Sequence, residues 1–274
     1  INKVSVIIKN KSGEESLAET FTINCGRSDR PNLFLITVGT SDYKDDRFDL
    51  SYAAKDANDL NALFSGYSAN HYASVRTMTL TNAEVKKETF NQLKSFLAQA
   101  KRNDQLIFYI AGHGLLDENY AYYYGTHDVD FLSPQTRGLA YDKLEEILAG
   151  IAPVKKLLIM DTCHSGEVDS DEVEIVEENE GEDEDLNFED VSFRAVGPKL
   201  REGDGTRASA GKMARMLFAD IRKGTGATVI SRAGGVEFAM EGDDWKNGLF
   251  TYCLLNGMTN KTADLNEDGV IMLS

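Results

Sequence analysis

The sequence predicts an α/β fold with a mainly parallel sheet of about six strands and helices on both faces. Runs of almost continuous apolar residues at 32–39 (NLFLITVG) and 105–112 (QLIFYIAG) alternate with amphipathic helical segments such as 52–66. Continuous apolar strands are typical of parallel sheets, which are buried on both faces. Gly39 and Gly112 close two of these runs and mark the sheet edge where such folds place their functional sites.

The remaining elements follow from the same patterns. Residues 1–25 alternate around the turn NKSG and predict a β-hairpin, either the end of an upstream β-domain or an extra hairpin of the main domain. Residues 26–31 are expected to be a linker. Thr81 and Glu84 have the spacing of a capping box, which predicts a helix start. Further strands are expected at 74–80, 121–125, 155–161 and 226–232, and further helices at 81–102, 141–151, 211–224 and 248–258.

Negative charge is concentrated in one stretch. The 274 residues carry a formal net charge of −16, and residues 167–190 contain fourteen Asp or Glu and no Lys or Arg. The rest of the chain is therefore almost neutral, which disfavours nucleic-acid binding through a basic surface. Residues 167–209 lack periodicity over about forty residues, which predicts a mobile acidic loop.

Targeting and redox signals are sparse. No apolar run is long enough to span a bilayer, and no signal-peptide pattern opens the chain, so we expect no membrane partner and a cytoplasmic location. Cys25, Cys163 and Cys253 are far apart with no CxxC pair, which excludes a disulfide framework. Because the chain starts at Ile1 without Met and ends inside a motif, we expect it to be a fragment.

Reactive side chains follow two of the predicted strands. Cys163 follows the run 155–161 in the segment LLIMDTCHSG, and His113 lies between two glycines after the run 105–112. A cysteine attacks as the thiolate and needs a nearby base. His164 is the alternative base, but neighbours on an extended chain point to opposite faces, which favours His113. The opposing interpretation is a small buried cysteine with two structural histidines.

These two motifs, QLIFYIAGHG and KKLLIMDTCHSG, closely resemble the caspase-like cysteine peptidases, in particular the metacaspase and bacterial orthocaspase branch. The resemblance extends over residues 32–258 and implies a caspase-hemoglobinase-like three-layer sandwich. It also implies an endopeptidase that uses Cys163 as nucleophile, His113 as acid and base, and Gly114 as an oxyanion donor. This Cys–His chemistry requires no cofactor. A peptidase domain is expected over 32–260, as a monomer or homodimer.

Two acidic residues predict the substrate. Asp161 lies two residues before Cys163, so both side chains are expected on one face, about 6–7 Å apart. Asp56 matches an acidic residue that lines the same pocket in metacaspases. Such a pocket favours a protein or peptide substrate with Arg or Lys at P1. The alternatives are a cap or turn role for Asp161, a solvated helix position for Asp56, and an acidic P1 residue bound by Arg232.

Two further expectations concern processing and calcium. In the predicted loop, or directly after it, lie basic residues at which the enzyme could cleave itself: Arg194, Lys199, Arg201, Arg207 and Lys212. The segment DLNEDGV places Asp264, Asn266 and Asp268 at alternate positions before Gly269, as in the first half of an EF-hand loop over 261–274. Ca²⁺ is therefore a candidate ligand, and an Asx-rich turn without an ion is the alternative.

The competing function is a non-catalytic caspase-like module for signalling or interaction. A different Cys–His hydrolase, of separase-like or gingipain-like type, would share the fold and the dyad. Cys163 and His113 are both present, which favours an enzyme over the interaction module.

Overall fold

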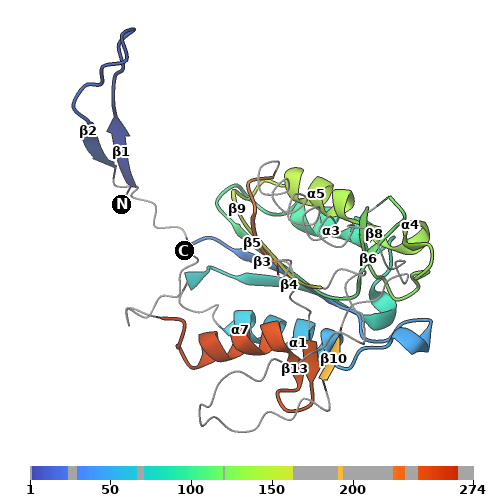
Figure 1. The fold of residues 1–274 in the computed structure, drawn as a ribbon. Coiled ribbons are helices and arrows are strands. Elements are labelled where there is room, and N and C mark those ends of the chain that lie inside the picture. Colours follow the sequence, from blue (N-terminus) through green and yellow to red (C-terminus); the bar gives the residue numbers. More distant parts are fainter. Residues whose placement is uncertain are drawn as a thin grey trace, which may run out of the picture. The chain divides into compact units, whose positions relative to one another are not determined.

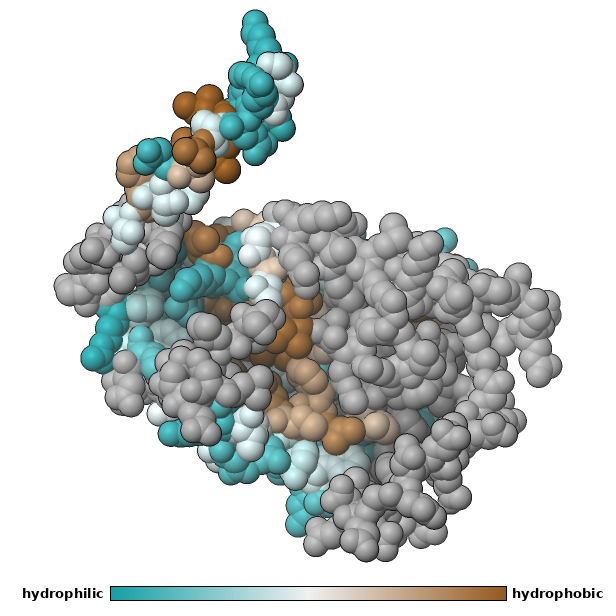
Figure 2. Space-filling model, turned by 60° about the vertical axis from the view of Figure 1, so that its left-hand side comes forward, coloured by the Kyte–Doolittle hydropathy of each residue, from teal (hydrophilic) through white to brown (hydrophobic). Residues whose placement is uncertain are grey.

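The computed structural model describes residues 2–23, 30–66, 71–119, 121–162, 191–193, 225–231 and 240–264. The chain divides into two compact units, Ile1–Arg30 and Pro31–Ser274. In the first unit, β1 (Asn2–Val6) pairs antiparallel with β2 (Glu19–Ile23). Figure 2 shows apolar side chains along this hairpin, and those exposed include Val4, Val6, Ile8 and Phe21. Two strands alone are at best marginally stable in water.

The second unit is built around a five-stranded parallel sheet, and this confirms the predicted fold class. The strand order is β11-β9-β5-β3-β4, and each neighbouring pair is parallel. These strands are β3 (Leu33–Gly39), β4 (Val75–Thr81), β5 (Gln105–Gly112), β9 (Lys155–Thr162) and β11 (Thr228–Ser231).

Helices cover both faces of this sheet, which makes three layers (Figure 1). One face carries α3 (Phe90–Leu97) and α5 (Tyr141–Ala149), and the other carries α1 (Ala53–Gly66) and α7 (Leu249–Thr259). Gly39 ends β3 where α1 begins, and a Cβ atom there would lie 2.1 Å from the Ala53 carbonyl oxygen. A glycine is therefore required for the helix to start so close to the strand end.

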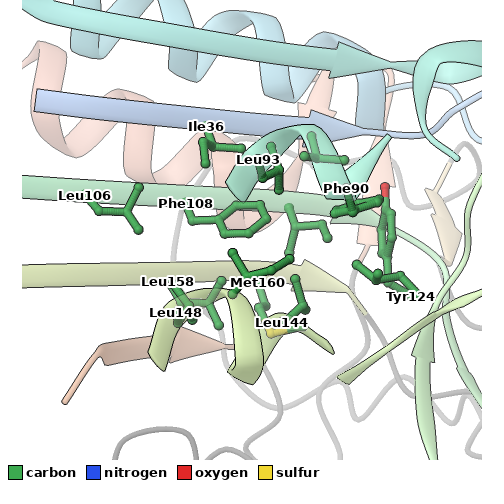
Figure 3. Close-up of a cluster of buried hydrophobic side chains, with 14 of the residues drawn as sticks. Ile36, Phe90, Leu93, Leu106, Phe108, Tyr124, Leu144, Leu148, Leu158 and Met160 are labelled. Carbon is green, nitrogen blue, oxygen red and sulfur yellow. The ribbon is translucent and has the colours of Figure 1, made fainter. Parts of the chain in front are cut away.

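The alternation of side chains along each strand divides the core between the two faces. Figure 3 shows Ile36, Phe108 and Met160, from three adjacent strands, packed against α3 and α5. The intervening residues Leu35 and Tyr109 belong to the core on the α1 and α7 face. Asp161 continues this second set, because it lies two residues after Ile159, the β9 partner of Tyr109. His113 lies on the same side, because its ring packs against Tyr43, which belongs to this core.

Three details differ from the sequence-based expectation. The predicted strand 121–125 is β7 (Tyr122–Tyr124), which lies outside the central sheet and pairs with β6 (Gly114–Leu116) and β8 (Leu139–Ala140). The capping box at Thr81 is present, but it closes the 3-10 turn η2 (Asn82–Glu84). The predicted long helix therefore begins only at Phe90.

The remaining elements are short. They are η1 (Asp46–Phe48), α4 (Pro134–Arg137), β10 (Val191–Phe193), β12 (Met240–Gly242) and β13 (Asn247–Gly248). β10, β12 and β13 form a separate antiparallel sheet. The predicted helix 211–224 and the acidic residues 167–190 lie outside the described residues.

Candidate active site

His113 lies directly after β5, at the carboxyl edge of the central sheet. The chain leaves the strand at Gly112, whose φ of +142° is in the region that favours glycine. The His113 residue is only 2% exposed. Its side chain therefore occupies a fixed, largely dry position at the edge where parallel α/β folds place their sites.

Groups from one loop contact both the backbone and the ring of His113. The backbone N–H of His113 donates to the Tyr43 hydroxyl at 3.0 Å. The ring atom Nε2 lies 2.8 Å from the Phe48 carbonyl oxygen. A carbonyl oxygen only accepts, so Nε2 carries the proton in the neutral ring. The Phe131 ring meets the imidazole edge-on, with centroids 5.6 Å apart.

The end of β9 lies beside the end of β5. The two strands are parallel neighbours, in a register that pairs Ala111 with Asp161 and Gly112 with Thr162. The condition on which the predicted pairing of His113 with Cys163 depended, adjacency of these two strands, is therefore met. Cys163, His164 and Arg232 lie outside the described residues.

Gly114 lies on the other side of His113 from Gly112. It is the first residue of β6, is buried, and pairs with Tyr124 of β7. The Gly125 N–H donates to the His113 carbonyl oxygen at 2.8 Å, which ties this segment to the following loop. The sequence-predicted oxyanion donor thus follows His113 at the same sheet edge.

Asp161 is fully buried within β9 and faces α7. Its Oδ2 accepts a hydrogen bond from the Thr251 hydroxyl at 2.8 Å. The Thr251 hydroxyl is also 2.7 Å from the Tyr109 hydroxyl. Asp161 is therefore a strand residue, and the alternative role as a helix cap or turn residue does not describe it.

Asp56, in the first turn of α1, is also fully buried rather than solvated. Its carboxylate accepts the Gly248 backbone N–H at 3.0 and 3.1 Å and the Asn247 amide at 2.8 Å. Gly248 is the N-cap residue of α7. Asp56 thus binds the amino end of a second helix, where the helix dipole favours a negative charge.

Glu241 is a third buried carboxylate that the sequence analysis missed. It is 1% exposed and accepts the backbone N–H groups of Ser51 at 2.6 Å and Tyr52 at 3.2 Å, directly before α1. In the β12–β13 pair it lies opposite Gly248. One signal was available: a Glu after the apolar residues Phe238, Ala239 and Met240 indicates a buried acid with partners.

Each of the three acidic residues is linked to the start of α7, by a side-chain hydrogen bond or by strand pairing. Asp56 binds Gly248, Glu241 is paired across from Gly248, and Asp161 binds Thr251 in the first turn of the helix. The groups that bind them are backbone N–H groups, an amide and a hydroxyl. Each of the three buried carboxylates thus accepts at least one hydrogen bond at this edge of the sheet, as buried polar groups require.

The predicted calcium ligands are described only in part. Asp264 is half-buried, and its backbone N–H donates to the Lys261 carbonyl oxygen. Asn266 and Asp268 lie outside the described residues. Within the described residues, no cluster of three or more His, Cys, Asp or Glu side chains is placed to bind a metal ion.

Comparison with known proteins agrees with this architecture. The family model described as the caspase domain matches residues 34–268. A crystal structure of a protein from Geobacter sulfurreducens superposes with a TM-score of 0.54 at 15% identity, covering 84% of this chain and 83% of that one. No curated protein matches the chain.

Across the described part of the chain, no helix has the length and apolar character needed to cross a bilayer.

Sheet order, layer arrangement and the family match over most of the sequence lead to one conclusion. The chain belongs to the caspase-domain family, whose members are typically cysteine peptidases.

Proposed function

We propose that this protein is a cysteine endopeptidase that cleaves peptide bonds after Arg or Lys. The observation that carries the proposal is the β5–β9 register, which pairs Gly112 with Thr162, the residues that precede His113 and Cys163. Neighbouring strands in a sheet are about 4.8 Å apart, which is within reach of a thiol–imidazole pair. We also propose that the protein belongs to the metacaspase and orthocaspase branch, because its two sequence motifs resemble those of that branch.

In this mechanism His113 takes the proton of the Cys163 thiol. Because Nε2 donates to the Phe48 carbonyl, Nδ1 is the ring nitrogen that exchanges the proton. The thiolate attacks the scissile carbonyl carbon, and the Gly114 N–H stabilises the resulting oxyanion. The imidazolium then protonates the leaving amine, and water hydrolyses the acyl-enzyme with His113 as base.

A peptidyl electrophile tests the enzyme against the non-catalytic alternative. We expect an Arg-containing acyloxymethyl ketone to modify the wild type once, and Cys163→Ala to remain unmodified and lose at least about 1000-fold in activity. Cys253→Ala is the matched control, because Cys253 is an exposed thiol on α7 and should be dispensable. Unmodified wild type would favour the interaction module.

The preference for a basic P1 residue rests on the three buried carboxylates. A guanidinium or ammonium group that reaches them replaces water in a site of low dielectric, where charge complementarity counts for several kcal/mol. A panel of fluorogenic peptides that differ only at P1 tests this. We expect Asp161→Asn and Asp56→Asn to reduce cleavage after Arg, and Asp142→Asn on the opposite layer to have no effect. A preference for Asp at P1 would contradict the proposal.

Self-processing is a second part of the proposal. The basic residues at which it would occur, Arg194, Lys199, Arg201, Arg207 and Lys212, lie outside the described residues. Incubation of wild type beside Cys163→Ala, followed by sequencing of new amino termini, decides the matter. We expect fragments only in the wild type, each beginning after Arg or Lys, whereas intact bands in both samples would remove the idea.

Calcium dependence is proposed from the sequence pattern alone, with Asp264, Asn266 and Asp268 as ligands. Activity on an Arg peptide with added Ca²⁺ and with a chelator measures it. Calorimetric titration of the inactive Cys163→Ala protein separates binding from catalysis. An Asp268→Asn variant that binds Ca²⁺ as tightly as its parent would favour the Asx-rich turn.

A further inference from the structure

Residues 40–50, within the loop that connects β3 to α1, contact His113 at two points. It supplies the Tyr43 hydroxyl to the His113 backbone N–H and the Phe48 carbonyl to Nε2. The Tyr43 ring also packs against the imidazole, with centroids 5.1 Å apart. One short segment therefore determines both where the His113 backbone lies and how its ring is turned.

His113 needs such support because it lies between two glycines. Glycine is the most permissive residue for the backbone, so the segment 112–114 has little rigidity of its own. Gly112 adopts a φ of +142°, and a Cβ atom there would lie 3.0 Å from the Tyr43 hydroxyl. The hydroxyl thus packs against the glycine at the same point where it accepts the next N–H group.

Tyr43 is itself held firmly. The residue is 4% exposed, and its ring meets Phe131 edge-on at 5.3 Å. Its backbone N–H donates to Asp49 Oδ1 at 2.7 Å, across the 3-10 turn η1 that also carries Phe48. The Asp49 carboxylate therefore ties together the two residues of the loop that hold His113.

We infer that Tyr43 is a positioning residue for His113 and that Asp49 holds the 40–50 loop in the conformation that makes this possible. The inference rests on the proposed function, since it assigns the loop a role in the same proton transfer. A group that must exchange a proton needs its distance fixed to a fraction of an ångström, and a displacement of about 1 Å can reduce the rate about 100-fold.

The first experiment compares Tyr43→Phe with Tyr124→Phe. Both remove a buried hydroxyl that packs on Gly112, but the Tyr124 hydroxyl donates to Ala111 and contacts Thr40 instead of His113. We expect Tyr43→Phe to lower kcat about 10-fold or more on an Arg peptide, with KM changed less than about twofold. Tyr124→Phe should keep kcat within about threefold of wild type. Equal losses of kcat in the two variants would overturn the inference.

A spectroscopic measurement tests the inference without turnover. With ¹⁵N-histidine labelling, and His113→Gln to assign the signals, the wild type should show a neutral ring protonated at Nε2. Tyr43→Phe and Asp49→Ala should shift the two ring nitrogens toward tautomer-averaged positions. Two control variants should leave the ring-nitrogen signals unchanged. They are Tyr124→Phe and Asp46→Ala, which lies in the same exposed turn but does not hydrogen-bond to Tyr43. Unchanged His113 signals in Tyr43→Phe would overturn the assignment of Tyr43 as a positioning residue.

These readouts separate the two proposals. Wild type that fails to react with the peptidyl electrophile would remove the proposed function, whereas the ¹⁵N signals of Tyr43→Phe would still report whether the loop positions His113. Active wild type with unperturbed Tyr43→Phe would retain the peptidase and remove Tyr43 as a positioning residue.

Discussion

The two edges of the central sheet differ in the charged side chains that they bury. At the amino edge, Lys156 near the start of β9 donates to the carbonyl oxygens of Leu148 at 2.7 Å and Thr225 at 3.0 Å. The same edge also buries the carboxylate of Asp104, directly before β5, which accepts backbone N–H groups. At the carboxyl edge, Asp161 near the end of the same strand is one of three buried carboxylates. One strand therefore carries a buried cation at one end and a buried anion at the other.

The direction of the helices explains this difference. Leu148 lies in the last turn of α5, where carbonyl groups point outward and favour a cation. Asp56 and Glu241 accept N–H groups at the starts of α7 and α1, where an anion is favoured. In a parallel α/β fold all strands run the same way, so helix starts gather at the carboxyl edge. The architecture thus favours anions at the edge where we place the P1 pocket.

The largest effect on stability is expected from Glu241→Ala, which removes a buried carboxylate at the carboxyl edge. Removing the carboxylate leaves the Ser51 and Tyr52 N–H groups without their acceptor, and hydrogen bonds to a charged group are worth about 1.5–3 kcal/mol each. We therefore expect the free energy of unfolding in urea to fall by about 3 kcal/mol. Asp244→Ala, an exposed change in the next turn, should cost less than about 0.5 kcal/mol. Equal urea midpoints for the two variants would contradict the prediction.

A smaller effect is expected from Lys156→Met at the opposite edge. The change removes two hydrogen bonds but also the cost of burying an ammonium group, a cost that lowers the pKa of Lys156. We expect a net loss of about 1 kcal/mol in urea unfolding. Cleavage of an Arg peptide should be unchanged, because Lys156 lies at the other end of β9 from the candidate site. A changed P1 preference would show that the two edges are coupled.

Much of this comparison could be predicted from the sequence. The apolar runs located β3, β5 and β9 to within about one residue, because a strand buried on both faces has a strong local signal. Their Gly and His ends gave the candidate site. Short strands such as β6 and β12 have only three residues each and carry no periodicity from which they could be identified.

Glu241 and the loop around Tyr43 could not be found in the same way. Glu241 binds Ser51 and Tyr52, about 190 positions away in the chain, so nothing near it in the sequence names its partners. The capping box at Thr81 led to the wrong prediction of a long helix starting there, because tertiary contacts end the helical turn after Glu84. Asn82 adopts a positive φ and its side chain accepts the Ser41 N–H, which stops the helix from continuing.

The third prediction concerns pH at the carboxyl edge. Tyr52 donates a hydrogen bond to Asp243, and this bond, with burial and the nearby Asp243 and Glu241 charges, raises the pKa of Tyr52 from 10.0 to about 12. The folded state therefore holds this proton more tightly than the unfolded state. Its contribution to stability should be complete below pH 10 and lost as the pH rises towards about 12. Thermal unfolding should show the decline in wild type and not in Tyr52→Phe, and Asp243→Asn should weaken it.

The smallest effect on stability is expected for an exposed charged residue that lies at neither edge of the sheet. Glu146, exposed on α5, accepts hydrogen bonds from Lys143 and Lys94, which lower its pKa from 4.5 to about 2. The pair stabilises the folded state above pH 4.5, and this contribution is lost as the pH falls towards about 2. Solvent screens exposed pairs, so Glu146→Gln should lower the melting temperature only slightly at pH 7, and not at all in about 1 M salt. Lys156→Met should keep its full effect in that salt, because both of its acceptors are buried carbonyl groups rather than exposed charges. If Glu146→Gln still lowered the melting temperature in about 1 M salt, the prediction that only the buried charges resist salt screening would be wrong.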